Sequence, residues 1–238
     1  MNIALIGYGR MGHEIETIAA ERGHIIKLKI DVDNRDDINT ENFREIDVAI
    51  EFSSPDSALA NIVRCLEMKK PVVSGTTGWL KNYDQAAELC VKMGTSFIHS
   101  SNFSVGVNIL FKLNSLLAKI METHKEYSPL IEEIHHLKKL DAPSGTAISL
   151  AESIMAQDHD FKGWCFEGSG SKSCIKIRSV REGTVPGTHT VEWNSEIDTI
   201  SLKHVARNRK GLALGAVLAA EYISLRKGVF TLSDVLGF

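Results

Sequence analysis

The sequence predicts an α/β protein in which a doubly wound parallel sheet is joined to a second α+β domain with a mostly antiparallel sheet. Short apolar strands alternate with amphipathic helical patterns over residues 1–105, and this order is typical of parallel sheets. Beyond a long helical pattern that begins at residue 105, segments of alternating residues indicate further strands. We therefore expect two domains, with the boundary near residue 105.

The composition is that of an ordinary globular protein. The chain has 238 residues, of which 43% are hydrophobic and 24% are charged, and these values exclude a disordered or fibrous protein. Its net charge of −3 argues against a nucleic-acid partner. Cys65, Cys90, Cys165 and Cys174 form no CxxC pair, so we expect reduced thiols. Because there is neither a signal-like N-terminus nor a long apolar span, we expect a cytoplasmic protein without a membrane partner.

A glycine-rich turn follows the first predicted strand, Asn2 to Ile6, and precedes a helical pattern. Gly7 permits the tight turn, Gly9 lets a pyrophosphate approach the backbone, and Gly12 allows the helix to pack on the strand. Strand, GxGxxG and helix together predict a Rossmann-like dinucleotide site. The candidate cofactor-binding residues are Gly7, Tyr8, Gly9, Arg10, Met11 and Gly12.

The second predicted strand, Ile25 to Ile30, ends at Asp31. This position is about 20 residues beyond the glycine turn, where a carboxylate can accept hydrogen bonds from the adenosine ribose. The alternative is a glycine-rich turn followed by an exposed aspartate, but the combination of strand, helix and acid favours cofactor binding. Asp31 would repel a 2′-phosphate while Arg35 could attract one, so we expect NADH as cofactor with possible use of NADPH.

Two later strands of the first domain end in small polar residues. The strand Pro71–Ser74 runs into Gly75-Thr76-Thr77, and the strand Ser96–His99 runs into Ser100-Ser101-Asn102-Phe103. Ligands of open parallel sheets bind beyond the carboxyl ends of strands, so both loops are candidate sites. Alternatively, the threonine and asparagine side chains only satisfy the backbone of their own turns.

The second domain is predicted to have two long helices and a sheet. A helix is expected at 105–124, a mobile glycine-rich loop at 158–173, and strands at 174–180, 188–193 and 199–205. Residues 211–227 form a further, strongly apolar helical pattern.

The stretch from Leu130 to Ile148 contains the most reactive groups. His135 and Lys139 are four residues apart, so they share a face in either a strand or a helix, whereas His136 points elsewhere. Pro143 then ends any regular element. A histidine titrates near neutrality and can donate a proton at working pH.

A predicted helix start follows Pro143. Ser144 can cap the helix, and the free amides of Gly145, Thr146 and Ala147 would point at an incoming anion. Two imidazoles, an ammonium and an anion-binding helix terminus predict a small anionic substrate that receives a proton.

The run from Glu133 to Ala147, EIHHLKKLDAPSGTA, resembles the signature of the 4-hydroxy-tetrahydrodipicolinate reductases, formerly called dihydrodipicolinate reductases. Further motifs match in the same order, so the resemblance covers nearly the whole chain. It implies reduction of a small dicarboxylate, 4-hydroxy-tetrahydrodipicolinate, with NADH or NADPH, in the diaminopimelate route to lysine. It also implies a homotetramer, a dinucleotide-binding domain of residues 1–105 and 211–238, and a substrate-binding and oligomerisation domain of residues 106–210.

The resemblance also implies roles for individual residues. His135 would be the proton donor and Lys139 a second donor. His136, Gly145 and Thr146 would bind the carboxylates of the substrate. The loops Gly75–Thr77 and Ser100–Phe103 would hold the nicotinamide half of the cofactor.

The sequence departs from the family pattern at three places. The glycine turn lacks a residue that many members carry, and Glu51 stands where an aspartate is usual. The common Glu-Arg pair after the second strand is missing, which leaves the cofactor preference open.

Three alternative functions have less support from the sequence. A metal site formed by the histidines with Glu132 and Glu133 lacks a third histidine or HExxH spacing, so we expect none. A semialdehyde dehydrogenase would need an exposed cysteine, but Cys65 and Cys90 fall in predicted helices. A nucleotide sensor would not need His135 and Lys139.

Overall fold

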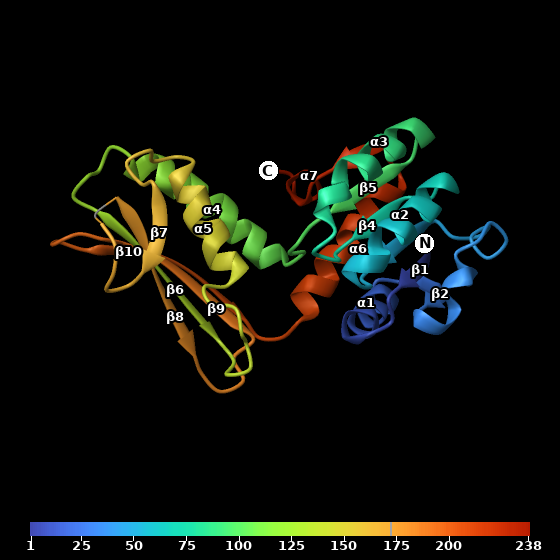
Figure 1. The fold of residues 1–238 in the computed structure, drawn as a ribbon, viewed down its shortest axis with the longest axis horizontal. Coiled ribbons are helices and arrows are strands. Elements are labelled where there is room, and N and C mark those ends of the chain that lie inside the picture. The colour runs from blue at the N-terminus through green and yellow to red at the C-terminus, as the bar shows by residue number, and fades with distance from the viewer. Residues whose placement is uncertain (172) are drawn as a thin grey trace. The chain divides into compact units, whose positions relative to one another are not determined.

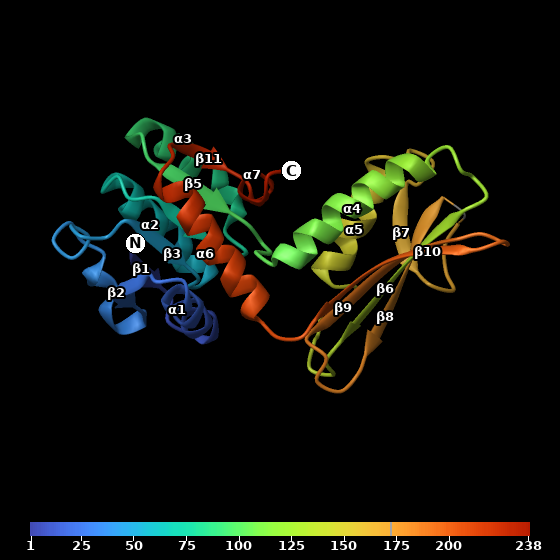
Figure 2. The same ribbon diagram turned by 180° about the vertical axis from the view of Figure 1, so that it is seen from behind.

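The computed structural model describes residues 1–171 and 173–238, and the chain forms two compact units. Unit 1 contains Met1–Val105 and Arg209–Phe238, and unit 2 contains Gly106–Asn208. The C-terminal segment therefore returns to the unit in which the chain begins (Figures 1 and 2). Every helix among the described residues is too short or too polar to cross a membrane.

Unit 1 is built on a parallel sheet with the strand order β11-β5-β4-β3-β1-β2. Its strands are β1 (Asn2–Ile6), β2 (Ile25–Ile30), β3 (Val48–Glu51), β4 (Val72–Ser74), β5 (Ser96–His99) and β11 (Gly228–Phe230). The chain passes from β1 to β2 on one side and from β3 to β4 and β5 on the other. The strand order therefore reverses between β1 and β3, and ligands of such sheets bind at this point.

Helices cover both faces of this sheet, as Figures 1 and 2 show. On one face lie α1 (Arg10–Glu21), α6 (Lys210–Ser224) and α7 (Leu232–Leu236), and on the other lie α2 (Pro55–Glu67) and α3 (Tyr83–Met93). Short 3-10 turns, η1 (Val32–Asp37) and η2 (Leu80–Asn82), precede β3 and α3. Gly215 lets α6 lie directly on the loop after β5, because a Cβ there would be 1.7 Å from the carbonyl oxygen of Phe103. The predicted C-terminal helix thus completes the core of unit 1.

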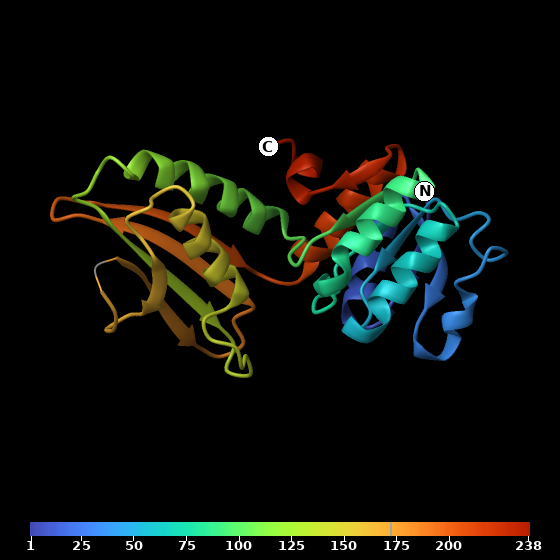
Figure 3. The same cartoon turned by 45° about the horizontal axis from the view of Figure 1, so that its top comes forward.

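Unit 2 consists of a sheet with the strand order β10-β9-β6-β8-β7 and two helices. Figure 3 shows both helices on the same face of the sheet. The elements are α4 (Val105–Met121), β6 (Ser128–His135), α5 (Gly145–Met155), β7 (Gly163–Phe166), β8 (Cys174–Arg181), β9 (Gly187–Asn194) and β10 (Thr199–Ala206). The core between the helices and the sheet includes Leu110, Leu150, Ile177 and Trp193.

The sheet of unit 2 is mixed. The strand β9 is antiparallel to β6 and β10, as the alternating segments predicted, but β8 is parallel to β6 and β7. The parallel pairs arise because the chain crosses over through α5 after β6 and then re-enters the sheet in the same direction. Strand patterns do not reveal this direction, because it depends on the path of the connection.

The predicted loop at 158–173 contains a strand that the sequence analysis missed. Its four residues, Gly163–Phe166, pair with β8 but are too few to show a periodic pattern. Residue 172, in the same predicted loop, lies outside the described residues. The expectation of four reduced thiols is also wrong for one pair, because Cys165 and Cys174 on these neighbouring strands form a disulfide. Cys65 and Cys90 are free, buried and helical, as expected.

Candidate active site

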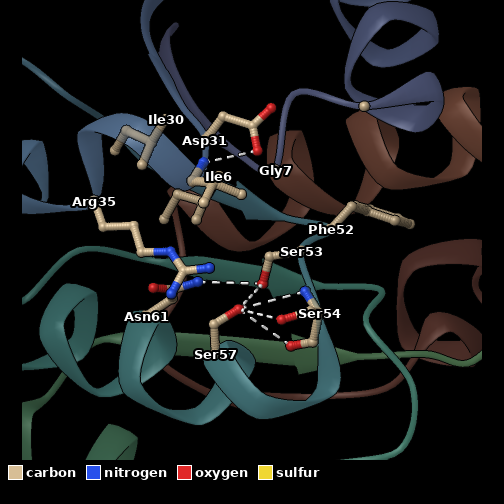
Figure 4. Close-up of a pocket in the computed structure, with 12 residues that line it drawn as sticks. Ile6, Gly7, Ile30, Asp31, Arg35, Phe52, Ser53, Ser54, Ser57 and Asn61 are labelled. Atoms are coloured by element: carbon tan, nitrogen blue, oxygen red, sulfur yellow. Dashed lines mark hydrogen bonds between the residues drawn. The ribbon is translucent and has the colours of Figure 1, made fainter.

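A pocket of about 260 Å³ opens in unit 1 where the strand order reverses. Its lining includes Gly7 and Gly9 after β1, Asp31 and Arg35 after β2, and Ser53 after β3. In Figure 4 the labelled lining residues come from the carboxyl ends of three strands and from the start of α2, where Ser54 and Ser57 lie. The predicted fingerprint and the predicted acid therefore line the same pocket.

The three fingerprint glycines are needed for different reasons. A Cβ on Gly7 would lie 2.1 Å from the carbonyl oxygen of Phe52, and one on Gly12 would lie 2.6 Å from the carbonyl oxygen of Gly7. A Cβ on Gly9, by contrast, would meet no atom of the described chain within 4 Å. Gly9 therefore leaves room for a group outside the chain, and a dinucleotide pyrophosphate fits this need.

The start of α1 supplies the charge complement for such a group. Gly9 is the N-cap, so the amides of Arg10, Met11 and Gly12 precede the first intrahelical hydrogen bonds and can donate to an anion. The side chain of Tyr8 turns away to other partners, since its hydroxyl bonds to Glu16 and accepts from Lys29 at 3.0 Å. Tyr8 can therefore serve the pocket only through its backbone.

Asp31 and Arg35 bring opposite charges to the pocket. One carboxylate oxygen of Asp31 accepts from the amide of Val32 at 2.9 Å and caps η1. In Figure 4 the second carboxylate oxygen of Asp31 points away from this hydrogen bond. The side chain of Arg35 extends from η1 over the pocket. The pocket can therefore offer an acceptor to ribose hydroxyls and a donor to a phosphate.

A buried carboxylate ties two strand ends of unit 1 together. Glu51, the last residue of β3, is fully buried, and its two oxygens accept from Ser74 Oγ at 2.7 Å, Thr76 Oγ1 at 2.8 Å and the Ser53 amide at 3.0 Å. The hydroxyl of Ser53 bonds to it as well. Glu51 therefore joins the pocket wall to the Gly75-Thr76-Thr77 loop, although the sequence showed it only as a departure from a family pattern.

The two predicted nicotinamide loops largely satisfy their own polar groups. The side chain of Thr76 bonds to Glu51, the Asn102 carbonyl accepts from Ser100 Oγ at 2.9 Å, and the Asn102 side chain accepts from the amide of Ser104 at 2.9 Å. Phe103 is buried, whereas Thr77 and Ser101 are exposed. Gly75 is required by packing, because a Cβ there would lie 2.1 Å from the ring of Phe52.

In unit 2, three strands place four charged or titratable side chains on one buried face. His135 ends β6 and is 7% exposed, and Glu133 precedes it by two residues on the same face. The strand register sets Arg181 of β8 beside His135 and His189 of β9 opposite Glu133. The core-facing side of β6 thus changes from apolar at Ile131 to ionic at its end.

Glu133 is the centre of this cluster. Its Oε2 bonds to His135 Nδ1, and its Oε1 accepts from Arg181 Nη1 at 2.9 Å. Burial opposes the charged carboxylate, but the neighbouring side chains of His135, Ser179 and Arg181 outweigh burial and hold the pKa of Glu133 at about 2. Because the ionised carboxylate only accepts hydrogen bonds, His135 Nδ1 must be the donor in this pair.

His189 is held neutral beside His135. The two rings lie edge to face with centroids 5.1 Å apart, and His189 Nε2 is 3.2 Å from Ser144 Oγ. Burial and, to a smaller extent, the neighbouring His135 lower the pKa of His189 to about 4. His189 Nδ1 has no hydrogen-bond partner among the residues that the structure describes. His189 therefore adds no positive charge to the cluster at neutral pH.

Lys139 lies in the loop after β6 and not on a strand or helix that also carries His135. The argument from a spacing of four residues therefore does not apply. Its ammonium donates to both oxygens of Asp141 at 2.8 Å, and it is near enough to His189 to disfavour a charge there. Lys138 is exposed, as expected for a solvated charge. His136 is half-buried, and its Nδ1 lacks a partner within the described chain.

The helix start at α5 is as predicted, with one difference. Ser144 is the N-cap, and its hydroxyl accepts from the amide of Ala147 at 3.3 Å. Ala147 is therefore already paired, whereas the amides of Gly145 and Thr146 precede the first turn and can donate to an anion. A Cβ on Gly145 would meet nothing of the described chain within 4 Å, so the backbone is open to a ligand there.

The ligand atoms of Glu133, His135 and His189 lie within 4.8 Å of one another, close enough to be tested as a metal site. Two contacts oppose a bound cation. Arg181 already neutralises Glu133, and the ammonium of Lys139 adds a further positive charge near His189. We therefore interpret the cluster as a proton-handling group, in which Arg181 and His189 are members that sequence patterns alone did not identify.

An open parallel sheet with a glycine turn at its switch point, joined to a unit with titratable groups near a helix start, defines a two-domain nicotinamide-dependent oxidoreductase. The family model for "dihydrodipicolinate reductase, N-terminus" matches residues 1–103, and the model for the C-terminus matches residues 106–236. The chain therefore belongs to the dihydrodipicolinate reductase family.

Named relatives agree with this assignment. The chain is 52% identical to the 4-hydroxy-tetrahydrodipicolinate reductase of Christiangramia forsetii, over 99% of this chain and 98% of that protein. It is 34% identical to the same enzyme of Thermosipho africanus, with 99% and 98% covered. The fold is similar to that of a dipicolinate-bound dihydrodipicolinate reductase from Paenisporosarcina sp. TG-14, with a TM-score of 0.81, 22% identity and 97% of each chain covered.

Proposed function

We propose that this chain reduces 4-hydroxy-tetrahydrodipicolinate to tetrahydrodipicolinate in the diaminopimelate route of lysine biosynthesis. Family membership supports the reaction class. The observation that carries the proposal is the buried imidazole of His135, paired with a carboxylate, in the same unit as a helix start with free amides. This arrangement can bind an anionic substrate and give it a proton.

The reduction requires a hydride at carbon and a proton at the atom that becomes negative. A reduced nicotinamide supplies the hydride when it is bound. His135 donates the proton from Nε2, because Nδ1 is engaged by Glu133. Lys139, held by Asp141, acts as a second donor and balances the negative charge of the substrate. The substrate carboxylates bind to His136 and to the amides of Gly145 and Thr146.

The cofactor is bound by unit 1 through the glycine turn, Asp31 and the strand-end loops Gly75–Thr77 and Ser100–Phe103. Asp31 accepts from the ribose and favours NADH, whereas Arg35 in the same pocket permits NADPH. The proposed preference is therefore modest. Arg35→Ala should weaken use of NADPH more than use of NADH, as the ratio of kcat/KM values for the two cofactors would reveal.

We further propose a homotetramer and a cytoplasmic location. The helices α4 and α5 cover one face of the unit 2 sheet (Figure 3), and the other face carries the half-buried Leu130 and Ile134, which suit a contact between subunits. Light scattering of the purified protein tests the tetramer. Cell fractionation tests the location, for which the disulfide between Cys165 and Cys174 removes the argument from reduced thiols.

The activity is tested with purified protein, NADH or NADPH, and the product of a dihydrodipicolinate synthase generated in the same cuvette. We expect the nicotinamide absorbance to fall with substrate present. His135→Ala and Lys139→Ala should each lower kcat by about 10² to 10⁴ while NADH still binds. Lys138→Ala removes an adjacent, exposed charge and is the matched control, expected to behave as the unmodified protein. Full turnover in Lys139→Ala would refute its role.

A further inference from the structure

We infer that Glu133 is the positioning residue of the site: it orients His135 and keeps on it the proton that the reaction consumes. The inference deepens the proposed function and rests on it for the identity of the reaction. Glu133 is fully buried beneath His135, so it acts through the imidazole and not on the substrate.

The carboxylate of Glu133 cannot turn away from His135. One oxygen bonds to His135 Nδ1 and the other accepts from Arg181 Nη1. Arg181 is in turn anchored by the carbonyl oxygens of Val180, at 2.8 Å, and Asp141, at 2.6 Å. His135, Glu133 and Arg181 therefore form a row whose far end is fixed by the backbone.

This row determines which nitrogen of His135 faces outward. Since Nδ1 donates to Glu133, the transferable proton is on Nε2. A Cβ on Gly187 would lie 3.0 Å from this Nε2, so the glycine leaves the space in front of it clear. The ring is thus held in one orientation, with its second donor at an open position.

The neighbouring groups distinguish His135 from His189. Two imidazoles 5.1 Å apart disfavour double protonation, and only His135 contacts a carboxylate. His189 has a hydroxyl partner at Nε2 and faces another imidazole, His204 of β10, across the strand pair.

The remaining charges near the cluster act in both directions. Arg181 of β8 and Lys139 of the loop after β6 bring positive charge to the cluster, and Asp141 partly neutralises both of them. Glu133 is the one of these charged groups that bonds directly to the His135 ring, and electrostatic interaction falls with separation and strengthens in a buried site.

The chain offers a matched control in the preceding residue. Glu132 lies on the opposite face of β6, is 30% exposed at its side chain and pairs with Arg178 at 3.0 Å. Glu132→Gln therefore removes the same charge from the same strand without touching His135. An effect seen in Glu133→Gln but not in Glu132→Gln therefore comes from the contacts of Glu133 on the buried face of β6.

The test measures kcat/KM against pH for Glu133→Gln, Glu132→Gln and Arg181→Gln. Glu133→Gln should lower kcat by about 10² or more, and the pH above which activity falls should move down by about one unit. Arg181→Gln should raise the pH above which activity falls, because the carboxylate of Glu133 then interacts with His135 alone. Glu132→Gln should leave it unchanged. A purely structural role would not produce shifts of opposite sign in these two variants. If the pH above which activity falls is unchanged in both Glu133→Gln and Arg181→Gln, the inference is overturned.

Direct titration of the His135 ring by NMR separates this inference from the proposed function. If the protein reduces no dipicolinate-type substrate but the ring titrates at lower pH in Glu133→Gln, the reaction assignment fails and the pairing stands. If the ring titrates at the same pH in Glu133→Gln as in the unmodified protein, the pairing fails whatever the reaction. Should Glu133→Gln not fold, the upward shift in Arg181→Gln decides the matter.

Discussion

The two units each bury one glutamate near the end of a strand, and the surroundings of these glutamates differ. Glu51 in unit 1 is surrounded by hydroxyl groups and an amide, whereas Glu133 in unit 2 is surrounded by an arginine and a histidine. Neutral donors hold a carboxylate in place without offering it a proton to share. Cationic partners make it part of a charge system. The first arrangement suits a scaffold and the second suits proton transfer.

The same contrast extends to the rest of each site. Unit 1 uses glycines, backbone amides and small hydroxyl side chains, because phosphates require close approach and fixed dipoles. Unit 2 instead presents imidazoles, a carboxylate and an ammonium group, which are side chains that can bind and release protons. Substitutions that affect the two glutamates unequally test whether this division is real.

The largest expected loss of stability is in Glu133→Ala. This change leaves the guanidinium of Arg181 and the buried ring of His135 without their anion, and breaking a buried ion pair costs about 3 to 5 kcal/mol. Urea denaturation measures it. A loss below that of Glu51→Ala would show that the charge system contributes less than we infer.

The stability of the protein should fall in acid because of His189. Its pKa in the fold is about 4, below the ordinary 6.5, so the unfolded chain binds this proton more tightly and stability declines as pH falls from 6.5 to 4. The shift corresponds to about 3 kcal/mol. A second decline should follow between pH 4.5 and about 2 as Glu133 is protonated. Urea midpoints of His189→Gln should change less over the first interval; an equal slope would exclude His189 as its source.

Glu51→Ala should have a smaller effect, about 1 to 3 kcal/mol, because the hydroxyls of Ser53, Ser74 and Thr76 can rotate to other acceptors. The affinity for NADH should fall as the loop after β4 loosens, which fluorescence titration would detect. Glu51→Gln keeps one acceptor oxygen, so its affinity for NADH should lie between that of the unmodified protein and that of Glu51→Ala. Unchanged cofactor affinity in Glu51→Ala would argue against a positioning role for this carboxylate.

The smallest stability effect is expected for Gly9→Ala, because the added Cβ meets nothing of the described chain within 4 Å. NADH affinity should nevertheless drop by about tenfold or more, since the methyl group occupies space that the pyrophosphate needs. Gly7→Ala is its counterpart: with φ at +93° and the oxygen of Phe52 at 2.1 Å, it should destabilise the fold itself. Unimpaired NADH binding by Gly9→Ala would place the phosphates elsewhere.

Local patterns predicted most of unit 1. The glycine turn, Asp31 and the alternating strands and helices appear in the structure at or within a few residues of the predicted positions, because these signals depend on neighbouring residues. The helix cap at Ser144 was predicted for the same reason. The short strand Gly163–Phe166 and the disulfide beside it were not, since each depends on a partner strand.

The sequence by itself determined the family and the parallel sheet with its fingerprint, and it drew attention to the segment around His135, because motif, periodicity and capping are written in consecutive residues. Only the tertiary structure decided what surrounds that histidine. Arg181 and His189 reach Glu133 through strand register, and Glu51 acquires its donors from two strand ends. Burial and pairing between distant segments keep Glu133 charged and His189 neutral, and no local pattern encodes either.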